Sequence, residues 1–141
     1  MPVVRNPQFN FREGFCWNNV LLPTLEEGKR IKARRKSKAV NDVASMSLYS
    51  IDNAMVPNYY LIVLLCSRYF YDYLKTFINN TVNLQINDFR LFPIIIPDET
   101  ILSTAKDLFD RAIAARKTTT NQGLHLVEQE VDHFVKELYS I

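Results

Sequence analysis

The sequence predicts an α+β fold in which a small mixed sheet packs on a central helix and an antiparallel helical hairpin follows. Short aromatic and branched stretches separated by turn residues occupy the first fifty positions, a stretch of helical periodicity lies in the middle, and two heptad-like stripes come last. A chain of 141 residues, 48% of them hydrophobic, is long enough to bury a core and too apolar to be disordered. Residues 1–97 are expected to form one module and residues 98–141 a helical arm.

The beginning of the module is expected to consist of short strands and loops. Phe15 and Trp17 are aromatic residues that favour strands, and the turn residues Asn18 and Asn19 follow them. Residues 46–51 alternate between apolar and polar side chains, as a half-buried strand does. We expect Trp17 to lie in the core rather than to stack on a ligand.

The middle of the chain predicts a long helix at the centre of the module. Over residues 58–77, apolar side chains recur three or four positions apart. Asn79 and Asn80 are expected to end this helix, because asparagine tolerates the left-handed conformation that often follows a last helical turn. A short turn at residues 86–90 and a buried strand at residues 91–96, which a proline stops, are expected next.

The last part of the chain predicts two helices. Spacings of four and three residues separate the apolar positions of the first helix, which are Ile101, Ala105, Leu108, Ala112 and Ala115. The same spacings recur in the second helix, at Leu124, Val127, Val131, Phe134 and Leu138. Two interpretations stay open. The helices form an antiparallel hairpin, whose second stripe could also join two copies in a homodimer, or they simply dock on the core of the module.

The composition argues against several classes of function. Three glycines are too few for a glycine-rich phosphate loop, and two cysteines, Cys16 and Cys66, cannot supply a disulfide framework or a four-ligand zinc site. His125 and His133 are eight residues apart, too far to share a metal ion on one helix face. Because no catalytic constellation assembles, we expect the chain to be non-catalytic and to bind no cofactor itself.

Nothing in the sequence predicts export or membrane insertion. The longest uncharged apolar run, residues 59–66, is far shorter than the roughly 20 residues that cross a bilayer. The first residues lack the pattern of a secretory signal. We therefore expect a cytoplasmic protein with reduced thiols.

Positive charge is concentrated in one stretch, residues 29–38, which we call the basic segment. Residues 1–97 contain 12 Lys and Arg against 7 Asp and Glu, whereas residues 98–141 contain 5 against 8. The basic segment holds seven cations and no acid: Lys29, Arg30, Lys32, Arg34, Arg35, Lys36 and Lys38. Such a run is typical of a surface that binds a polyanion. The alternative is a solvated loop or edge strand, because lysines also protect exposed strands from pairing.

If the chain binds a nucleic acid, the cations of the basic segment would make two kinds of contact. Most would neutralise phosphates, while Arg34 or Arg35 could pair bidentately with guanine. The amides of Asn18 and Asn19 could contact adenine. The other candidate contacts are Arg12 and a polar group at the end of the middle helix, made up of Thr76, Asn79, Asn80 and Thr81.

Three other functions remain open. A protein-interaction module would use the basic segment against an acidic partner and the second helical stripe for self-association. An RNA-binding domain would hold single strands on exposed aromatic rings. An enzyme is the least favoured, since the catalytic residues do not assemble.

Five stretches, in order along the chain, resemble motifs of one protein family. They are Phe11–Val20 with its aromatic–x–x–Gly–x–x–Trp pattern, Arg34 with Val40–Tyr49, Tyr60–Ser67, Leu91–Pro97 and Glu130–Tyr139. Together they resemble the C-terminal target-recognition region of adenine-specific DNA methyltransferases from restriction–modification and phage-defence systems. These include the type IIG restriction enzymes, the PglX-type methyltransferases and the TaqI-like specificity domains.

The resemblance implies sequence-specific recognition of double-stranded DNA by a non-catalytic specificity part. S-adenosylmethionine would bind only in a methyltransferase domain or subunit, which would be a partner of this chain. The helical arm would act as a spacer that docks on the recognition module or on the catalytic domain. The chain would be either a C-terminal piece of such an enzyme or a free-standing specificity polypeptide.

Overall fold

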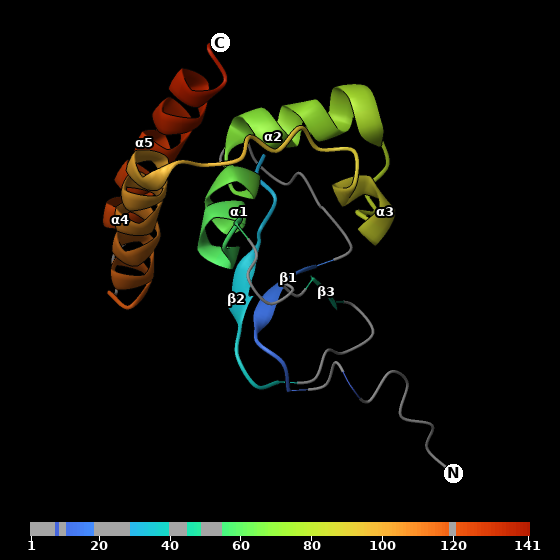
Figure 1. Ribbon diagram of the computed structural model, residues 1–141, viewed down its shortest axis with the longest axis horizontal. Helices are drawn as coiled ribbons and strands as arrows, with labels where there is room; N and C mark the ends of the chain where they lie inside the picture. Colours follow the sequence, from blue (N-terminus) through green and yellow to red (C-terminus); the bar gives the residue numbers. More distant parts are fainter. Residues whose placement is uncertain (1–7, 9–10, 19–28, 40–44, 49–54, 119–120) are drawn as a thin grey trace.

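In the computed structural model a small sheet lies beside a group of helices, which confirms the predicted α+β class (Figure 1). The structure describes residues 8, 11–18, 29–39, 45–48, 55–118 and 121–141. The strands are β1 (Gly14–Asn18), β2 (Arg34–Lys36) and β3 (Ser45–Leu48). The helices are α1 (Asn58–Leu65), α2 (Arg68–Tyr73), the π-helical η3 (Leu74–Ile78), α3 (Ile86–Phe89), α4 (Glu99–Arg116) and α5 (Gln122–Leu138).

Strand β1 is the centre of the sheet, and both neighbours run antiparallel to it, so the sheet is simpler than the mixed one expected. Because side chains alternate along a strand, Phe15 and Trp17 share one face, and both are buried in the core. The Trp17 Nε1 donates a hydrogen bond to the Leu84 carbonyl over 3.1 Å. The Trp17 ring also lies 4.0 Å, centroid to centroid, from that of Phe89 in α3. These contacts confirm Trp17 as a core residue.

The prediction of a single helix over residues 58–77 is wrong, because the helix is interrupted between α1 and α2. Ser67 is fully buried and extended, with φ −77° and ψ 153°. Its hydroxyl donates to the Leu64 carbonyl over 2.6 Å and accepts from the Phe70 N–H, so that one side chain ends α1 and begins α2. The apolar faces of both helices still point to the same core, which explains why the periodicity continues through the break.

The buried strand predicted for residues 91–96 is also wrong. The segment begins in the turn that ends α3, continues to α4 without regular secondary structure as the golden trace in Figure 1, and pairs with none of the described strands. Its backbone is held by side chains instead: the Tyr60 hydroxyl donates to the Ile95 carbonyl over 2.9 Å, and the Tyr139 hydroxyl to the Pro93 carbonyl over 2.7 Å. Ile96 is 58% exposed rather than buried.

Helices α4 and α5 pack against each other as an antiparallel hairpin, which also docks on the core through α1 and α2. Asp98 begins α4 by accepting the Ile101 N–H over 2.8 Å. Across the hairpin, Arg111 makes a two-pronged ion pair with Glu130 and thereby lowers the pKa of that carboxyl. Both interpretations of the helical arm therefore hold together: the hairpin forms, and it is docked.

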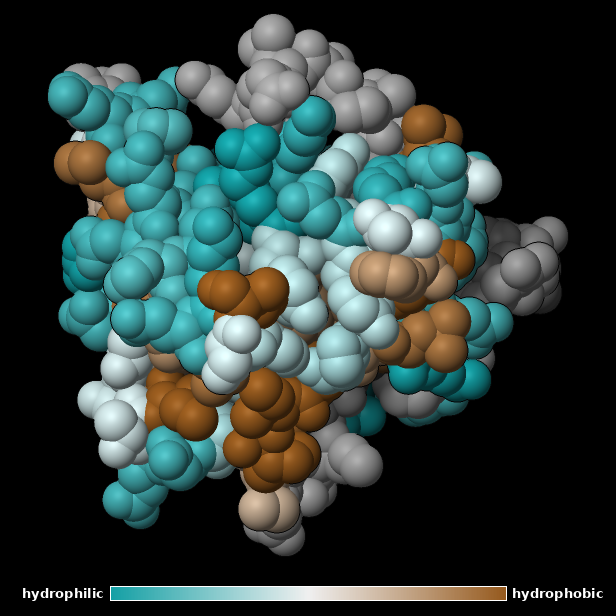
Figure 2. Space-filling model, turned by 90° about the horizontal axis from the view of Figure 1, so that it is seen from above, coloured by the Kyte–Doolittle hydropathy of each residue, from teal (hydrophilic) through white to brown (hydrophobic). Residues whose placement is uncertain are grey.

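One hydrophobic core spans the boundary expected at residue 97, since it contains Phe15 of β1 as well as Val127, Val131 and Val135 of α5. Viewed from above, the side formed by α4 and α5 is largely hydrophilic, and hydrophobic residues reach the surface in separate patches (Figure 2). Among the described residues, no helix has the length and apolar character needed to span a membrane.

Candidate nucleic-acid interface

The basic segment contributes β2, one of the two edge strands of the sheet. Because β1 is central, β2 pairs with it on one side only, with Arg34 opposite Cys16 and Arg35 opposite Phe15. Neighbouring residues of a strand point to opposite faces, so Arg34 and Arg35 lie on opposite sides of the sheet, and both are exposed. The expectation that one guanidinium alone can turn toward a base edge fits this alternation.

Arg35 has an acidic neighbour at the surface. Its Nη2 lies 3.4 Å from Oε1 of Glu13, and both side chains are more than half exposed. An exposed ion pair of this kind contributes only about 0.2–1 kcal/mol and is screened by salt. A phosphate could therefore take the place of Glu13 at little cost, and the Arg35 charge stays available to a ligand.

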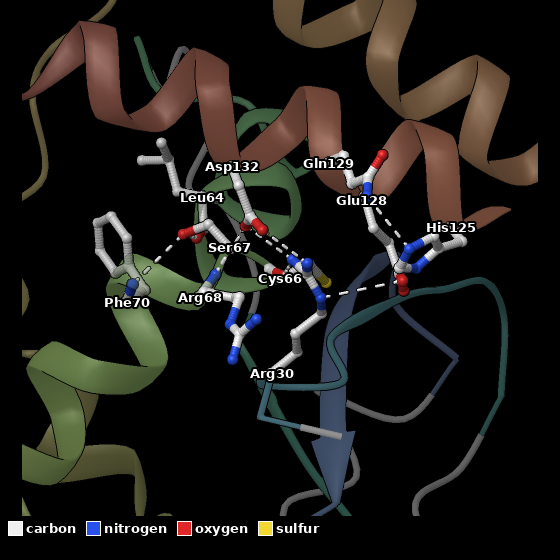
Figure 3. Close-up of polar contacts among 10 residues, drawn as sticks. All are labelled: Arg30, Leu64, Cys66, Ser67, Arg68, Phe70, His125, Glu128, Gln129 and Asp132. Carbon is white, nitrogen blue, oxygen red and sulfur yellow. Dashed lines mark hydrogen bonds and ion pairs between the residues drawn. The ribbon is translucent and has the colours of Figure 1, made fainter. Parts of the chain in front are cut away.

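Arg30 is engaged inside the protein rather than at its surface. Its guanidinium, 11% exposed, forms two hydrogen bonds with the Asp132 carboxylate of α5, at 2.8 and 2.7 Å. It also donates to the Cys66 carbonyl over 3.0 Å, and its Nε is 3.9 Å from Glu128. Figure 3 shows the Arg30 side chain between the α1–α2 junction and α5. Arg30 is therefore not among the candidate DNA contacts that the structure leaves at the surface.

Asp132 is the residue of this cluster that the sequence did not identify. Asp132 lies where α5 meets the α1–α2 junction, and there it also accepts the Arg68 backbone N–H over 2.9 Å. The available signal was its position beside Val131 in the apolar stripe, since residues that flank a buried stripe meet neighbouring elements.

The other cations of the basic segment differ in exposure. Lys36 is only 5% exposed, and Lys29 is half-buried. Lys32, before β2 in the chain, and Lys38, after it, are exposed. We give the name exposed basic edge to the exposed cations of β2 and its flanks together with Arg12, which precedes β1; they are Arg12, Lys32, Arg34, Arg35 and Lys38.

Asn18 is exposed at the end of β1, whereas Asn19 lies outside the described residues. The polar group at the end of η3, which was expected to contact a nucleic acid, contains an Asn79 that bonds within its own loop. Asn79 is extended (φ −152°) rather than left-handed, and its amide nitrogen donates to the Asn83 carbonyl and the Asp88 carboxylate. Its amide oxygen accepts from Thr81. The Asn79 amide is thus occupied by its own loop.

The predicted homodimer stripe of α5 is largely used within the chain. Val127 and Val131 are 5% and 6% exposed, and Phe134 and Leu138 pack against the same core. A second copy could reach this stripe only by displacing α4 or the core.

The thiols and imidazoles of the described residues do not form a catalytic group. Cys16 is buried. Burial also raises the pKa of the Cys66 thiol to about 11, so this thiol is protonated at neutral pH and is a poor nucleophile there. His125 and His133 are exposed on α5, as a helix surface predicts. No group of three metal-ligating side chains occurs in the part of the chain that the structure describes.

The geometry therefore offers a basic, solvent-facing sheet edge, and the Arg30–Asp132 pair ties the chain shortly before this edge to α5. Comparisons with protein-family models, with curated proteins and with solved structures found no match to this chain.

Proposed function

We propose that the chain recognises double-stranded DNA through the exposed basic edge. The observation that carries the proposal is the placement of Arg34 and Arg35, two exposed guanidinium groups on the edge strand of the sheet, in a segment with no acid of its own. Exposed cations on one edge neutralise phosphates and release the counterions that surround DNA. The affinity should therefore depend strongly on salt.

A duplex fits this surface better than a single strand. Antiparallel strands enter the major groove in some DNA-binding proteins, where arginine pairs with guanine, and β2 is an edge strand, antiparallel to β1, that carries two exposed arginines. Proteins that hold single strands instead display aromatic rings for stacking. Phe15 and Trp17 in β1 are buried, so this strand offers no row of exposed rings for stacking, and Phe11 just before it is exposed.

The resemblance to target-recognition regions suggests the setting of this activity. We propose that the chain is the specificity part of an adenine-specific methyltransferase or a related restriction enzyme, and that catalysis and S-adenosylmethionine binding belong to a partner domain or subunit. The acidic helical arm would face away from the phosphates, because like charges repel.

Fluorescence anisotropy of a labelled mixed-sequence duplex tests the proposal. The variant Arg34→Gln/Arg35→Gln should bind at least about tenfold more weakly than the wild type and show a shallower dependence on salt between about 50 and 200 mM. The control variant Lys106→Gln/Lys136→Gln removes the same charge from exposed positions on α4 and α5.

The control separates a specific surface from general attraction. The control variant should retain nearly all the affinity of the wild type. Equal losses in both variants would reduce the interaction to net charge, and full affinity in Arg34→Gln/Arg35→Gln would exclude the exposed basic edge. Stronger binding to a single strand than to a duplex would favour the RNA-binding alternative.

A further inference from the structure

Phe11 combines two properties that a bulky apolar residue rarely shows. Its side chain is 63% exposed, and it lies outside the hydrophobic core. Its backbone has φ 62°, in the left-handed region that disfavours side chains with a large Cβ substituent. Strained residues of this kind are concentrated at functional sites, because folding alone would select glycine or asparagine there.

The position of Phe11 places it beside the exposed basic edge. Gly14 pairs with Lys36, so the chain before β1 and the chain after β2 leave the sheet at the same end. Figure 1 shows the two traces turning next to each other below the sheet. Arg12 follows Phe11 directly, and Lys38, at this same end, also has a positive φ of 25°. The exposed Phe11 therefore belongs to the same end of the sheet as Arg12 and Lys38.

Phe77 shows what an ordinary exposed phenylalanine looks like in this protein. It is 73% exposed, but its ring centroid lies 5.1 Å from that of Tyr73, and its helical backbone in η3 has no positive φ. Packing along that helix explains Phe77 without a ligand. Among the residues that the structure describes, neither core packing nor backbone preference accounts for Phe11.

We propose that Phe11 inserts between base pairs of the duplex as an apolar wedge. The proposal rests on the proposed function and names the way in which the same surface engages DNA. Proteins that insert an apolar side chain unstack one base step and bend the duplex, while flanking cations hold the phosphates on either side. Arg12 and Lys38 would supply these flanking charges.

The test compares a matched duplex with one that carries a central mismatch. A wedge favours the mismatch, because unstacking there has a smaller energetic cost, so the wild type should bind it about tenfold more tightly. A 2-aminopurine base placed next to the mismatch should brighten on binding, since an unstacked 2-aminopurine is no longer quenched.

Four variants complete the experiment. Phe11→Ala should lose both the preference and the fluorescence change, whereas the control Phe77→Ala should keep both. Phe11→Gly suits the positive φ, so it should stay folded by circular dichroism and behave like Phe11→Ala. Phe11→Leu keeps an apolar wedge and should retain much of the preference.

Each other outcome overturns the proposal in a recognisable way. If Phe11→Ala keeps the mismatch preference, or if the wild type has none, the wedge is excluded while DNA recognition by Arg34 and Arg35 still stands. If the wild type binds neither duplex at low salt, the proposed function fails, and the wedge fails with it.

Discussion

Replacing Asp132 by asparagine should destabilise the protein by about 2 kcal/mol. The substitution keeps the size of the side chain and removes its charge. In the wild type this carboxylate receives two hydrogen bonds from the Arg30 guanidinium and one from the Arg68 backbone N–H. The variant leaves the Arg30 charge, only 11% exposed, without its main partner.

The magnitude follows from the burial of the pair. Removing one partner of a fully buried ion pair costs about 3–5 kcal/mol, whereas an exposed pair contributes about 0.2–1 kcal/mol. The side chains of Arg30 and Asp132 are 11% and 21% exposed, which places the pair between these limits. The Glu128 carboxylate, 3.9 Å from the Arg30 Nε, remains in the variant and offsets part of the loss.

Urea denaturation followed by circular dichroism measures the change. The midpoint should fall while the slope stays the same, because the surface exposed on unfolding is unchanged. A double-mutant cycle combines Asp132→Asn with Arg30→Met. The sum of the stability losses of the two single variants should exceed the stability loss of the double variant by about 1–2 kcal/mol. The exposed Lys106–Asp110 pair offers a control: Lys106→Gln should cost less than about 1 kcal/mol.

Two results would refute the reasoning. The first is a loss in Asp132→Asn no larger than that in the Lys106 control. The second is strict additivity in the cycle, which would mean that Arg30 and Asp132 contribute to stability independently of each other.

Three further predictions concern Ser67, Tyr139 and Cys66. Ser67→Ala should lower the free energy of unfolding by about 1–2 kcal/mol, measured in urea, because Phe70 loses its capping partner; an unchanged midpoint would contradict the role of this cap. Tyr139→Phe should cost about 1 kcal/mol through the lost bond to Pro93. Burial raises the pKa of Tyr139 from 10.0 to about 12. The contribution of its hydroxyl to the free energy of unfolding is therefore complete below pH 10 and is lost as the pH rises toward 12. Urea denaturation at pH values on both sides of 10 should show that the stability of the wild type declines more steeply with pH than that of Tyr139→Phe. Alkylation of Cys66 by iodoacetamide should be slow at neutral pH and rise toward pH 11, and mass spectrometry would disprove this if the native thiol reacted as fast as in the unfolded chain.

The elements that could be predicted from the sequence are those with local causes. Helices α4 and α5 follow from apolar spacing, and Asp98 was recognisable as a helix start. The break at Ser67 was missed because the periodicity of buried residues continues through it. A serine before a helical stretch was nevertheless a readable capping signal.

The parts that could not be predicted depend on contacts between distant residues. Residues 91–96 have the composition of a strand, but two tyrosine hydroxyls from other elements bind their backbone, and Pro93 lacks an N–H for a ladder. In the candidate site, the charge of the basic segment predicted a cationic surface. The withdrawal of Arg30 into the fold could not be predicted, since its partner Asp132 lies on another element.

The separation of these partners along the chain has a consequence for folding kinetics. Arg30 and Asp132 are 102 positions apart, whereas Arg111 and Glu130 of the hairpin are 19 apart. Closing a long loop is slower than forming local contacts, so the α4–α5 hairpin should form early and the Arg30–Asp132 pair late. A contact absent from the folding transition state affects the rate of unfolding. In stopped-flow experiments, Asp132→Asn should therefore unfold faster than the wild type and refold at nearly the same rate.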